Sequence, residues 1–202
     1  MIDRRFVILT AATLACAGSA QAAPAIGQAA PGFTATDAEG RARSLADFKG
    51  KTVVLEWTNN GCPYVKRAYS TGAMQDTQRQ ATAQGAVWLT VASSPPGQQG
   101  HVTAAEAKAW KSQSKAAWSD ILLDPQGKIA RAYEAKTTPH MFVIDPKGRV
   151  AYMGAIDDKP TNKADEAKGA KNYVLAALAD VRAGRAVAQP VTRPYGCSVK
   201  YS

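Results

Sequence analysis

The feature that most constrains the fold is an apolar run followed by a polar loop and a cysteine-proline pair. Residues 52–55 read Thr-Val-Val-Leu, a pattern typical of a strand covered on both faces of a sheet. Pro63 suits the first position of a helix, because its missing N–H would have no partner there. A helix start stabilises a thiolate, and Lys66 and Arg67 would add positive charge. We therefore predict a reactive thiol at Cys62, with an inert buried cysteine as the alternative.

Further apolar runs and helix signals alternate along the chain. Short β-rich runs predict strands, and a turn at 37–40 predicts an N-terminal hairpin; the strands are expected at 86–91, 121–123, 141–144 and 149–153. Helices are expected at 63–83, 103–112, 128–134 and 172–183, with one helical turn at 44–48. Such alternation predicts an α/β fold with a central mixed β-sheet and helices on both faces. The pattern indicates one domain, covering residues 23–185.

The two ends of the chain differ from this domain. Residues 1–22 combine Arg4 and Arg5 with an apolar run and a small-residue site ending at Ala22, which predicts a cleavable signal peptide. We therefore expect a periplasmic or secreted protein that has no membrane association after cleavage. Residues 186–202 contain two prolines and little periodicity. We call them the C-terminal tail and expect an extended segment that folds back over the domain.

Cysteine usage connects the tail to the domain. Cleavage would remove Cys16 and leave Cys62 and Cys197, an even number in a compartment where disulfides persist. Cys197, in the C-terminal tail, is the natural partner of Cys62. The pair could be redox-active or a permanent structural disulfide.

Charge and histidine content limit the classes of ligand. The formal net charge is +9, but Lys and Arg are dispersed among alanines without aromatic interleaving. This dispersion favours a solvated surface over nucleic-acid binding. His101 lies in a proline-rich loop, and His140 is expected to be a polar residue at a strand start. We predict no bound metal and no cofactor.

Several motifs occur together in the order expected of one fold. They are Gly32-Phe33, residues 45–51, the strand and loop leading to Cys62, Thr138-Pro139, and residues 142–148. With them the chain resembles the thioredoxin-fold redoxins, an AhpC/TSA-like group that includes peroxiredoxins and exported thiol-disulfide oxidoreductases. The resemblance implies a thioredoxin-like fold over residues 27–182. Together with the segment around Cys197, it indicates an exported peroxiredoxin-like branch of bacterial proteins.

The resemblance implies roles for individual residues. Cys62 matches the nucleophilic cysteine of thioredoxin-like proteins, while Val65 stands where their second cysteine would be. Resolution would therefore come from Cys197, from a small thiol or from another protein. Thr138 and Pro139 match the substrate-binding site at a cis-proline, where the preceding residue pairs with a bound peptide.

Two neighbouring residues on the predicted strand have further implied roles. Glu56 matches the buried acid thought to accept a proton in thioredoxins, since burial raises the pKa of a carboxyl group. A strand-end glutamate paired with a lysine is the alternative. Trp57 is assigned to the substrate-binding surface. Leu55 and Asn59 occupy positions of the peroxide-binding motif of peroxiredoxins, which argues against peroxidase chemistry.

These observations predict an exported thiol-disulfide oxidoreductase with Cys62 as nucleophile and Cys197 as resolving partner. Its partners would be thiol- or disulfide-bearing proteins or small thiols. Two alternatives stay open. One is a non-catalytic domain in which a permanent disulfide contributes about 4–5 kcal/mol by chain entropy. The other is a weak thiol peroxidase that forms sulfenic acid at Cys62.

Overall fold

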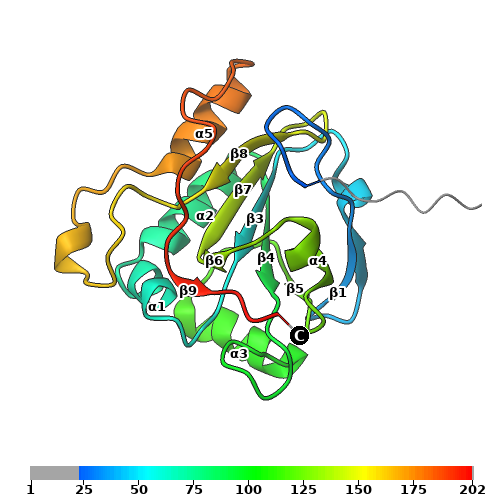
Figure 1. Cartoon of the computed structure of the whole chain (residues 1–202), viewed down its shortest axis with the longest axis vertical. Coiled ribbons are helices and arrows are strands. Elements are labelled where there is room, and N and C mark those ends of the chain that lie inside the picture. Colours follow the sequence, from blue (N-terminus) through cyan, green and yellow to red (C-terminus); the bar gives the residue numbers. More distant parts are fainter. Residues whose placement is uncertain (1–22, 202) are drawn as a thin grey trace, which may run out of the picture.

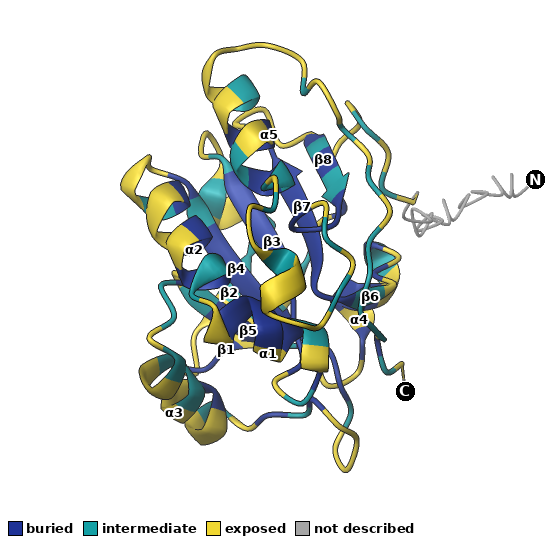
Figure 2. Cartoon of the chain, turned by 90° about the vertical axis from the view of Figure 1, so that its left-hand side faces the viewer, coloured by how far each residue is buried: buried dark blue, intermediate teal, exposed yellow. Residues whose placement is uncertain are grey.

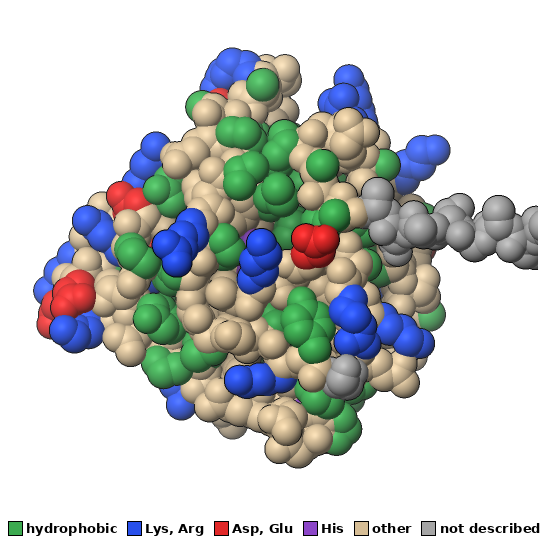
Figure 3. Space-filling view, in the orientation of Figure 1, with side chains coloured by type: hydrophobic (Ala, Val, Ile, Leu, Met, Phe, Trp, Pro, Cys, Tyr) green, Lys and Arg blue, Asp and Glu red, His purple; other side chains and the backbone are tan. Residues whose placement is uncertain are grey.

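The structure is a computed structural model that describes residues 23–201. The predicted signal peptide, residues 1–22, lies outside the described residues. Figure 1 shows a central sheet flanked by helices, with the C-terminal tail running across one side of the domain. On that face, Lys and Arg side chains are scattered among polar and apolar ones (Figure 3). Within the described range, no helix has the length and apolarity needed to cross a membrane.

In the described residues the main sheet has seven strands in the order β2-β1-β5-β4-β3-β7-β8. They are β1 (Thr34–Asp37), β2 (Ala42–Ser44), β3 (Val53–Trp57), β4 (Val87–Ala92), β5 (Asp120–Leu123), β7 (His140–Ile144) and β8 (Val150–Gly154). Strands β3, β4 and β5 are parallel to one another, whereas β7 is antiparallel to β3 and β8 to β7. The predicted mixed sheet and the N-terminal β1-β2 hairpin are confirmed. A separate small sheet pairs β6 (Thr137–Thr138) with β9 (Cys197–Ser198).

Helices cover both faces of the main sheet. One face is covered by α1 (Pro63–Ser70), α2 (Ala73–Ala83), α3 (Ala104–Ser114) and α5 (Tyr173–Arg182). The other is covered by α4 (Lys128–Ala132) and the 3-10 helix η1 (Leu45–Phe48). A second 3-10 helix, η2 (Asp165–Ala167), lies in the loop before α5. The prediction of one helix over 63–83 is wrong, because Gly72 adopts a φ of 79° and separates α1 from α2. A residue in the left-handed region cannot continue a right-handed helix.

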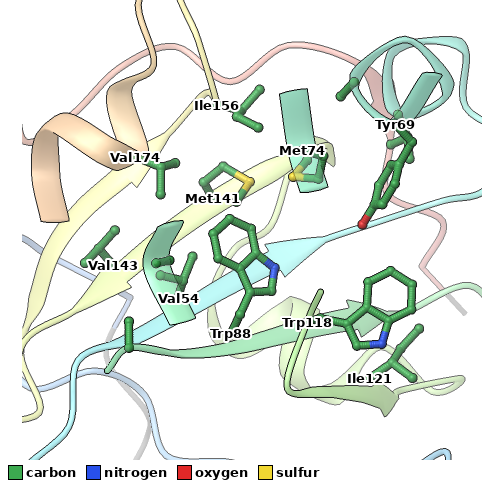
Figure 4. Close-up of a cluster of buried hydrophobic side chains, with 14 of the residues drawn as sticks. Val54, Tyr69, Met74, Trp88, Trp118, Ile121, Met141, Val143, Ile156 and Val174 are labelled. Atoms are coloured by element: carbon green, nitrogen blue, oxygen red, sulfur yellow. The ribbon is translucent and has the colours of Figure 1, made fainter. Parts of the chain in front are cut away.

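Strand β3 divides the core into two layers, and all its residues are buried. Val54 faces the layer that contains Trp88 and Met74, shown in Figure 4. Trp57 faces the opposite layer, where its ring lies 5.4 Å from that of Phe142. Figure 2 shows buried strands in the middle and exposed residues on the outer faces of the helices. The loop that follows β3 therefore leaves a rigid, fully buried strand.

The C-terminal tail is extended and packs along the domain, as predicted. Val191 forms a parallel bridge with Met153 of β8. Thr192 Oγ1 lies 2.6 Å from the hydroxyl of Tyr152. Gly154 makes this approach feasible, because a Cβ there would lie 2.2 Å from Thr192 Oγ1. Beyond this contact the tail turns across the domain and forms β9 (Figure 1).

Candidate active site around Cys62

Cys62 ends the loop after β3 and is the N-cap residue of α1. Its backbone N–H donates to the carbonyl oxygen of Asn59 at 3.0 Å, and its own carbonyl oxygen accepts from the N–H of Lys66 at 2.8 Å. Pro63 occupies the start of the helix, as predicted. The sulfur therefore lies at a helix N-terminus, where free N–H groups stabilise negative charge. Even so, Cys62 is 0% exposed, so other segments cover it.

The loop of residues 93–100 contacts the loop that leads to Cys62. Asn59 Nδ2 donates to the carbonyl oxygen of Gln99 at 3.3 Å, and Asn59 Oδ1 accepts from the N–H of Gly61 at 2.8 Å. The two loops approach closely, since a Cβ at Gly100 would lie 2.5 Å from Asn59 Cγ. Asn59 stands at a position that binds peroxide in peroxiredoxins. In this structure its side chain instead hydrogen-bonds to both loops and joins them.

The small β6-β9 sheet covers the sulfur. The Thr138–Pro139 peptide bond is cis, as the resemblance implied. In the sheet, Thr138 lies opposite Cys197. Cys62 Sγ donates to the carbonyl oxygen of Thr138 at 3.1 Å. The structure therefore brings together four of the residues that the sequence indicated: Cys62, Thr138, Pro139 and Cys197.

Cys62 and Cys197 are both free thiols, and both lie against Thr138, whose carbonyl oxygen accepts from Cys62 Sγ and which pairs with Cys197 in the small sheet. Burial favours the neutral form of Cys62, but the neighbouring Cys197, the N–H of Val65 and the side chain of Thr138 outweigh burial and lower the pKa of Cys62. Burial, together with the proximity and the charge of Cys62, raises the pKa of Cys197, which Lys200 partly opposes. Cys62 therefore loses its proton first and is the better nucleophile at neutral pH.

Glu56 is fully buried, and its carboxylate lies against Tyr69 and Trp88, two residues labelled in Figure 4. Its carboxylate accepts hydrogen bonds from four neutral donors: the Tyr69 hydroxyl and Trp88 Nε1, each at 2.8 Å, Gln78 Nε2 at 3.0 Å and Thr90 Oγ1 at 3.2 Å. We call these five residues the Glu56 cluster. Burial raises the pKa of Glu56, and the four hydrogen bonds oppose the shift. The alternative of a lysine partner is wrong, and the role of proton acceptor stays a prediction.

Trp57 is the last residue of β3, and its side chain is buried in the core. Its side chain is 0% exposed, its indole N–H donates to Ser93 Oγ at 3.1 Å, and its ring packs against those of Tyr133 and Phe142. A substrate cannot reach the Trp57 ring in this conformation. Its assignment to the substrate-binding surface stays a prediction.

Arg67 has a different role from the one expected. Instead of facing the Cys62 sulfur, its Nη1 lies 2.9 Å from Asp157 Oδ2 and its Nη2 donates to the Tyr195 hydroxyl at 2.7 Å. The same hydroxyl donates to Asp157. We call these residues the Arg67–Asp157–Tyr195 cluster. Sequence reasoning missed it, because nothing local pairs residues from three distant segments; its one sequence signal is the proximity of Tyr195 to Cys197.

His140 is the first residue of β7 and is buried. Its Nδ1 accepts from the N–H of Lys136 at 3.2 Å, and burial lowers the pKa of His140 to about 4, so the ring is neutral. Between residues 23 and 201, His, Cys, Asp and Glu form no group of three that could hold a metal ion. His140 therefore lies at a strand start, where the sequence placed it, but it is buried in the core.

Comparisons with known proteins agree with this architecture. A solved structure of an uncharacterized conserved protein from Geobacillus kaustophilus is similar, with a TM-score of 0.77 and 24% identity over 88% of this chain and 93% of that one. The thioredoxin domain of a thiol-disulfide oxidoreductase from Bacteroides vulgatus is similar with a TM-score of 0.50 and 26% identity, over 64% of this chain and 87% of that one. The fold is therefore thioredoxin-like, as predicted.

The family follows from the sequence comparison. The family model for the AhpC/TSA family matches residues 26–153, and the chain therefore belongs to that family. A curated relative, thiol-disulfide oxidoreductase ResA from Geobacillus thermodenitrificans (strain NG80-2), is 27% identical over 135 residues, which cover 63% of this chain and 68% of the relative. The resemblance to redoxins is confirmed.

Proposed function

We propose that this protein is an exported thiol-disulfide oxidoreductase in which Cys62 is the nucleophile and Cys197 is its resolving partner. The observation that carries the proposal is the meeting of two free thiols from distant parts of the chain at the N-terminus of α1, where Thr138 contacts Cys62 and pairs with Cys197. The name of the relative, a thiol-disulfide oxidoreductase, supports the reaction class. The sequence of residues 1–22 supports export, and hence a periplasmic or secreted location.

In the first step the Cys62 thiolate attacks one sulfur of a disulfide R–S–S–R′. A Cys62–S–S–R bond forms, the substrate S–S bond breaks, and R′–S⁻ leaves and takes up a proton. The lowered pKa of Cys62 increases the fraction of Cys62 present as thiolate. R and R′ belong to a disulfide-bearing protein or to a small thiol, since the chemistry of the step is the same for both.

In the second step Cys197 attacks the Cys62 sulfur. Once Cys62 carries R it has no charge, so one cause of the raised pKa of Cys197 is removed while the favourable effect of Lys200 remains. The Cys62–Cys197 disulfide forms and R–S⁻ leaves, so the substrate has gained two electrons. A reducing thiol regenerates the two cysteines, and the same steps in reverse oxidise a dithiol partner.

The test is a redox titration of the mature protein in glutathione buffers, followed by alkylation and mass analysis. We expect the wild type to pass between the dithiol and the internal disulfide at a potential above roughly −300 mV. In Cys197→Ser we expect a glutathione mixed disulfide at Cys62 to accumulate, and in Cys62→Ser no internal disulfide forms.

Two results would contradict the proposal. If the internal disulfide resists reduction throughout the glutathione range, the pair is the permanent structural disulfide of the alternative interpretation. If no internal disulfide forms at any ratio, Cys197 is not the resolving residue.

A further inference from the structure

The C-terminal tail has two opposing effects on Cys62. It covers the sulfur, which is 0% exposed, so a substrate disulfide reaches Cys62 only when the tail moves. It also carries Cys197, which must return to Cys62 for resolution. The contact is close, since a Cβ at Gly196 would lie 2.0 Å from the carbonyl oxygen of Thr138. How firmly the tail is held therefore controls both access and resolution.

The Arg67–Asp157–Tyr195 cluster joins the two segments that carry the thiols. Arg67 lies on α1, the helix whose N-cap is Cys62, and Tyr195 lies two positions before Cys197. A contact between Arg67 and Tyr195 therefore fixes the tail relative to the helix start. In Figure 1 the tail passes next to α1 just before it forms β9.

The cluster is built for a strong contact. Arg67 is 3% and Asp157 5% exposed, so their charges interact with little screening by water. The Tyr195 hydroxyl bonds to both charged groups, and hydrogen bonds to charged groups are stronger than neutral ones. Its ring also lies 5.9 Å from the Arg67 guanidinium carbon and 5.8 Å from the ring of Tyr64. In the described part of the chain, Arg67 Nε is buried without a hydrogen-bond partner, so the guanidinium bonds only within the cluster.

Other contacts hold the tail farther from the thiols. Thr192 contacts Tyr152 upstream, and Val199 donates its N–H to the carbonyl oxygen of Lys136 downstream at 3.1 Å. Tyr201 donates its hydroxyl to the carbonyl oxygen of Ala135. Of the three tail side chains of Thr192, Tyr195 and Tyr201, the Tyr195 side chain is the one that contacts an ion pair and the one that contacts α1.

We propose that Tyr195, held by Arg67 and Asp157, is a positioning residue that keeps Cys197 against Cys62. This inference rests on the proposed function. It assigns Tyr195 a role in the second step, in which Cys62–S–S–R and the Cys197 thiol yield the Cys62–Cys197 disulfide and R–SH. The same contact shields reduced Cys62 from outside reagents, so its loss changes the two rates in opposite directions.

The test compares Tyr195→Phe with Tyr64→Phe. The first removes the hydroxyl from the cluster but keeps the ring and the Arg67–Asp157 pair. The second removes a hydroxyl from the ring packed against Tyr195, outside the cluster. Far-UV circular dichroism and urea unfolding check that both variants fold.

Two rates are measured. In a Cys197→Ser background, the rate at which iodoacetamide alkylates Cys62 reports opening of the tail. In the two-cysteine protein, rapid acid quenching and mass analysis after addition of oxidised glutathione report conversion of the mixed disulfide to the internal disulfide. We expect Tyr195→Phe to alkylate roughly tenfold faster and to resolve roughly tenfold more slowly, as expected when a hydrogen bond to charged groups is lost. Tyr64→Phe should stay within about twofold of the wild type, because the cluster is intact.

Opposite changes in the two rates support the inference, since a general loss of stability would not slow resolution while leaving the fold intact. If Tyr195→Phe matches Tyr64→Phe in either rate, the inference is overturned. Failure of the proposed function looks different: the wild type itself would form no internal disulfide with oxidised glutathione. In that case the inference fails together with the proposed function, whatever alkylation rates are measured.

Discussion

Two buried polar clusters meet on α1 and differ in composition. The Glu56 cluster contains one acid and four neutral donors from β3, α1, α2 and β4. The Arg67–Asp157–Tyr195 cluster contains an ion pair and joins α1 to the loop after β8 and to the C-terminal tail. The first lies within the domain, and the second joins the domain to the C-terminal tail.

The difference shows where this fold places buried charge. Without a cation nearby, burial raises the pKa of Glu56 and favours its neutral form. Arg67 and Asp157 form an ion pair, and the hydrogen bond to Asp157 raises the pKa of Arg67 against the effect of burial. A neutral network joins strands and helices within the domain, whereas an ion pair contacts the tail near Cys62.

The largest expected effect comes from breaking the ion pair. Asp157→Ala leaves the Arg67 charge buried and uncompensated, so we expect a loss of about 3–5 kcal/mol in the free energy of unfolding. Urea unfolding measures it. The control is Asp165→Ala, since Asp165 is exposed and pairs with Lys168 at the surface; its loss should stay below about 1 kcal/mol. Equal losses in the two variants would show that the buried Arg67–Asp157 pair contributes no more to stability than the exposed Asp165–Lys168 pair.

A somewhat smaller effect is expected where the tail meets β6. Gly196→Ala places a Cβ 2.0 Å from the carbonyl oxygen of Thr138, so the tail must move away from Cys62. Overpacking of this kind costs about 1–3 kcal/mol, which corresponds to alkylation of Cys62 faster by about five- to 150-fold. Gly184→Ala is the matched control, because Gly184 also has a positive φ, 68°, but no atom within 4 Å of the added Cβ. Similar alkylation of both variants would mean that the tail does not shield the sulfur.

The Glu56 cluster is tested by the pH dependence of stability. Because the pKa of folded Glu56 is raised, its contribution to stability is fully present below the unfolded pKa and is lost as pH rises through the folded value. Relative to Glu56→Gln, the wild type should lose up to about 1.4 kcal/mol per pH unit above pH ~4.3. The measurement is the difference in unfolding free energy between the two proteins from pH 4 to 9. Parallel curves would mean that Glu56 is ionised as easily in the core as in water.

The smallest expected effect lies at the end of the tail. Tyr201 is 45% exposed, and its hydroxyl donates to the carbonyl oxygen of Ala135. Tyr201→Phe should therefore cost about 0.5–1 kcal/mol in tail docking and speed alkylation of Cys62 by less than about fivefold. If Tyr201→Phe speeds alkylation more than Tyr195→Phe does, the tail is held mainly at its C-terminal end and not by the Arg67–Asp157–Tyr195 cluster.

Particular elements show how far sequence reasoning reached. The strand at 52–55 and the helix start at Pro63 were predicted within a residue or two, because apolar runs and proline act on neighbouring residues. The prediction of one helix over 63–83 was wrong, because Gly72 adopts a left-handed conformation and ends α1, although the sequence pattern continues beyond it. The roles of Arg67 and Trp57 depended on what packs against them, which no local pattern specifies.

The sequence by itself determined that Cys62 lies at a helix start, since Cys62 and Pro63 define it through local backbone chemistry. It also determined the class of fold, through the alternation of apolar runs and helix signals. The tertiary structure decided which groups surround that thiol. The register of β9 on β6 places Cys197 opposite Thr138 and beside Cys62, and the buried Arg67–Asp157 pair receives Tyr195 from the tail. Such contacts join segments far apart in the chain, and their energies depend on burial and geometry that arise only when the whole domain has folded.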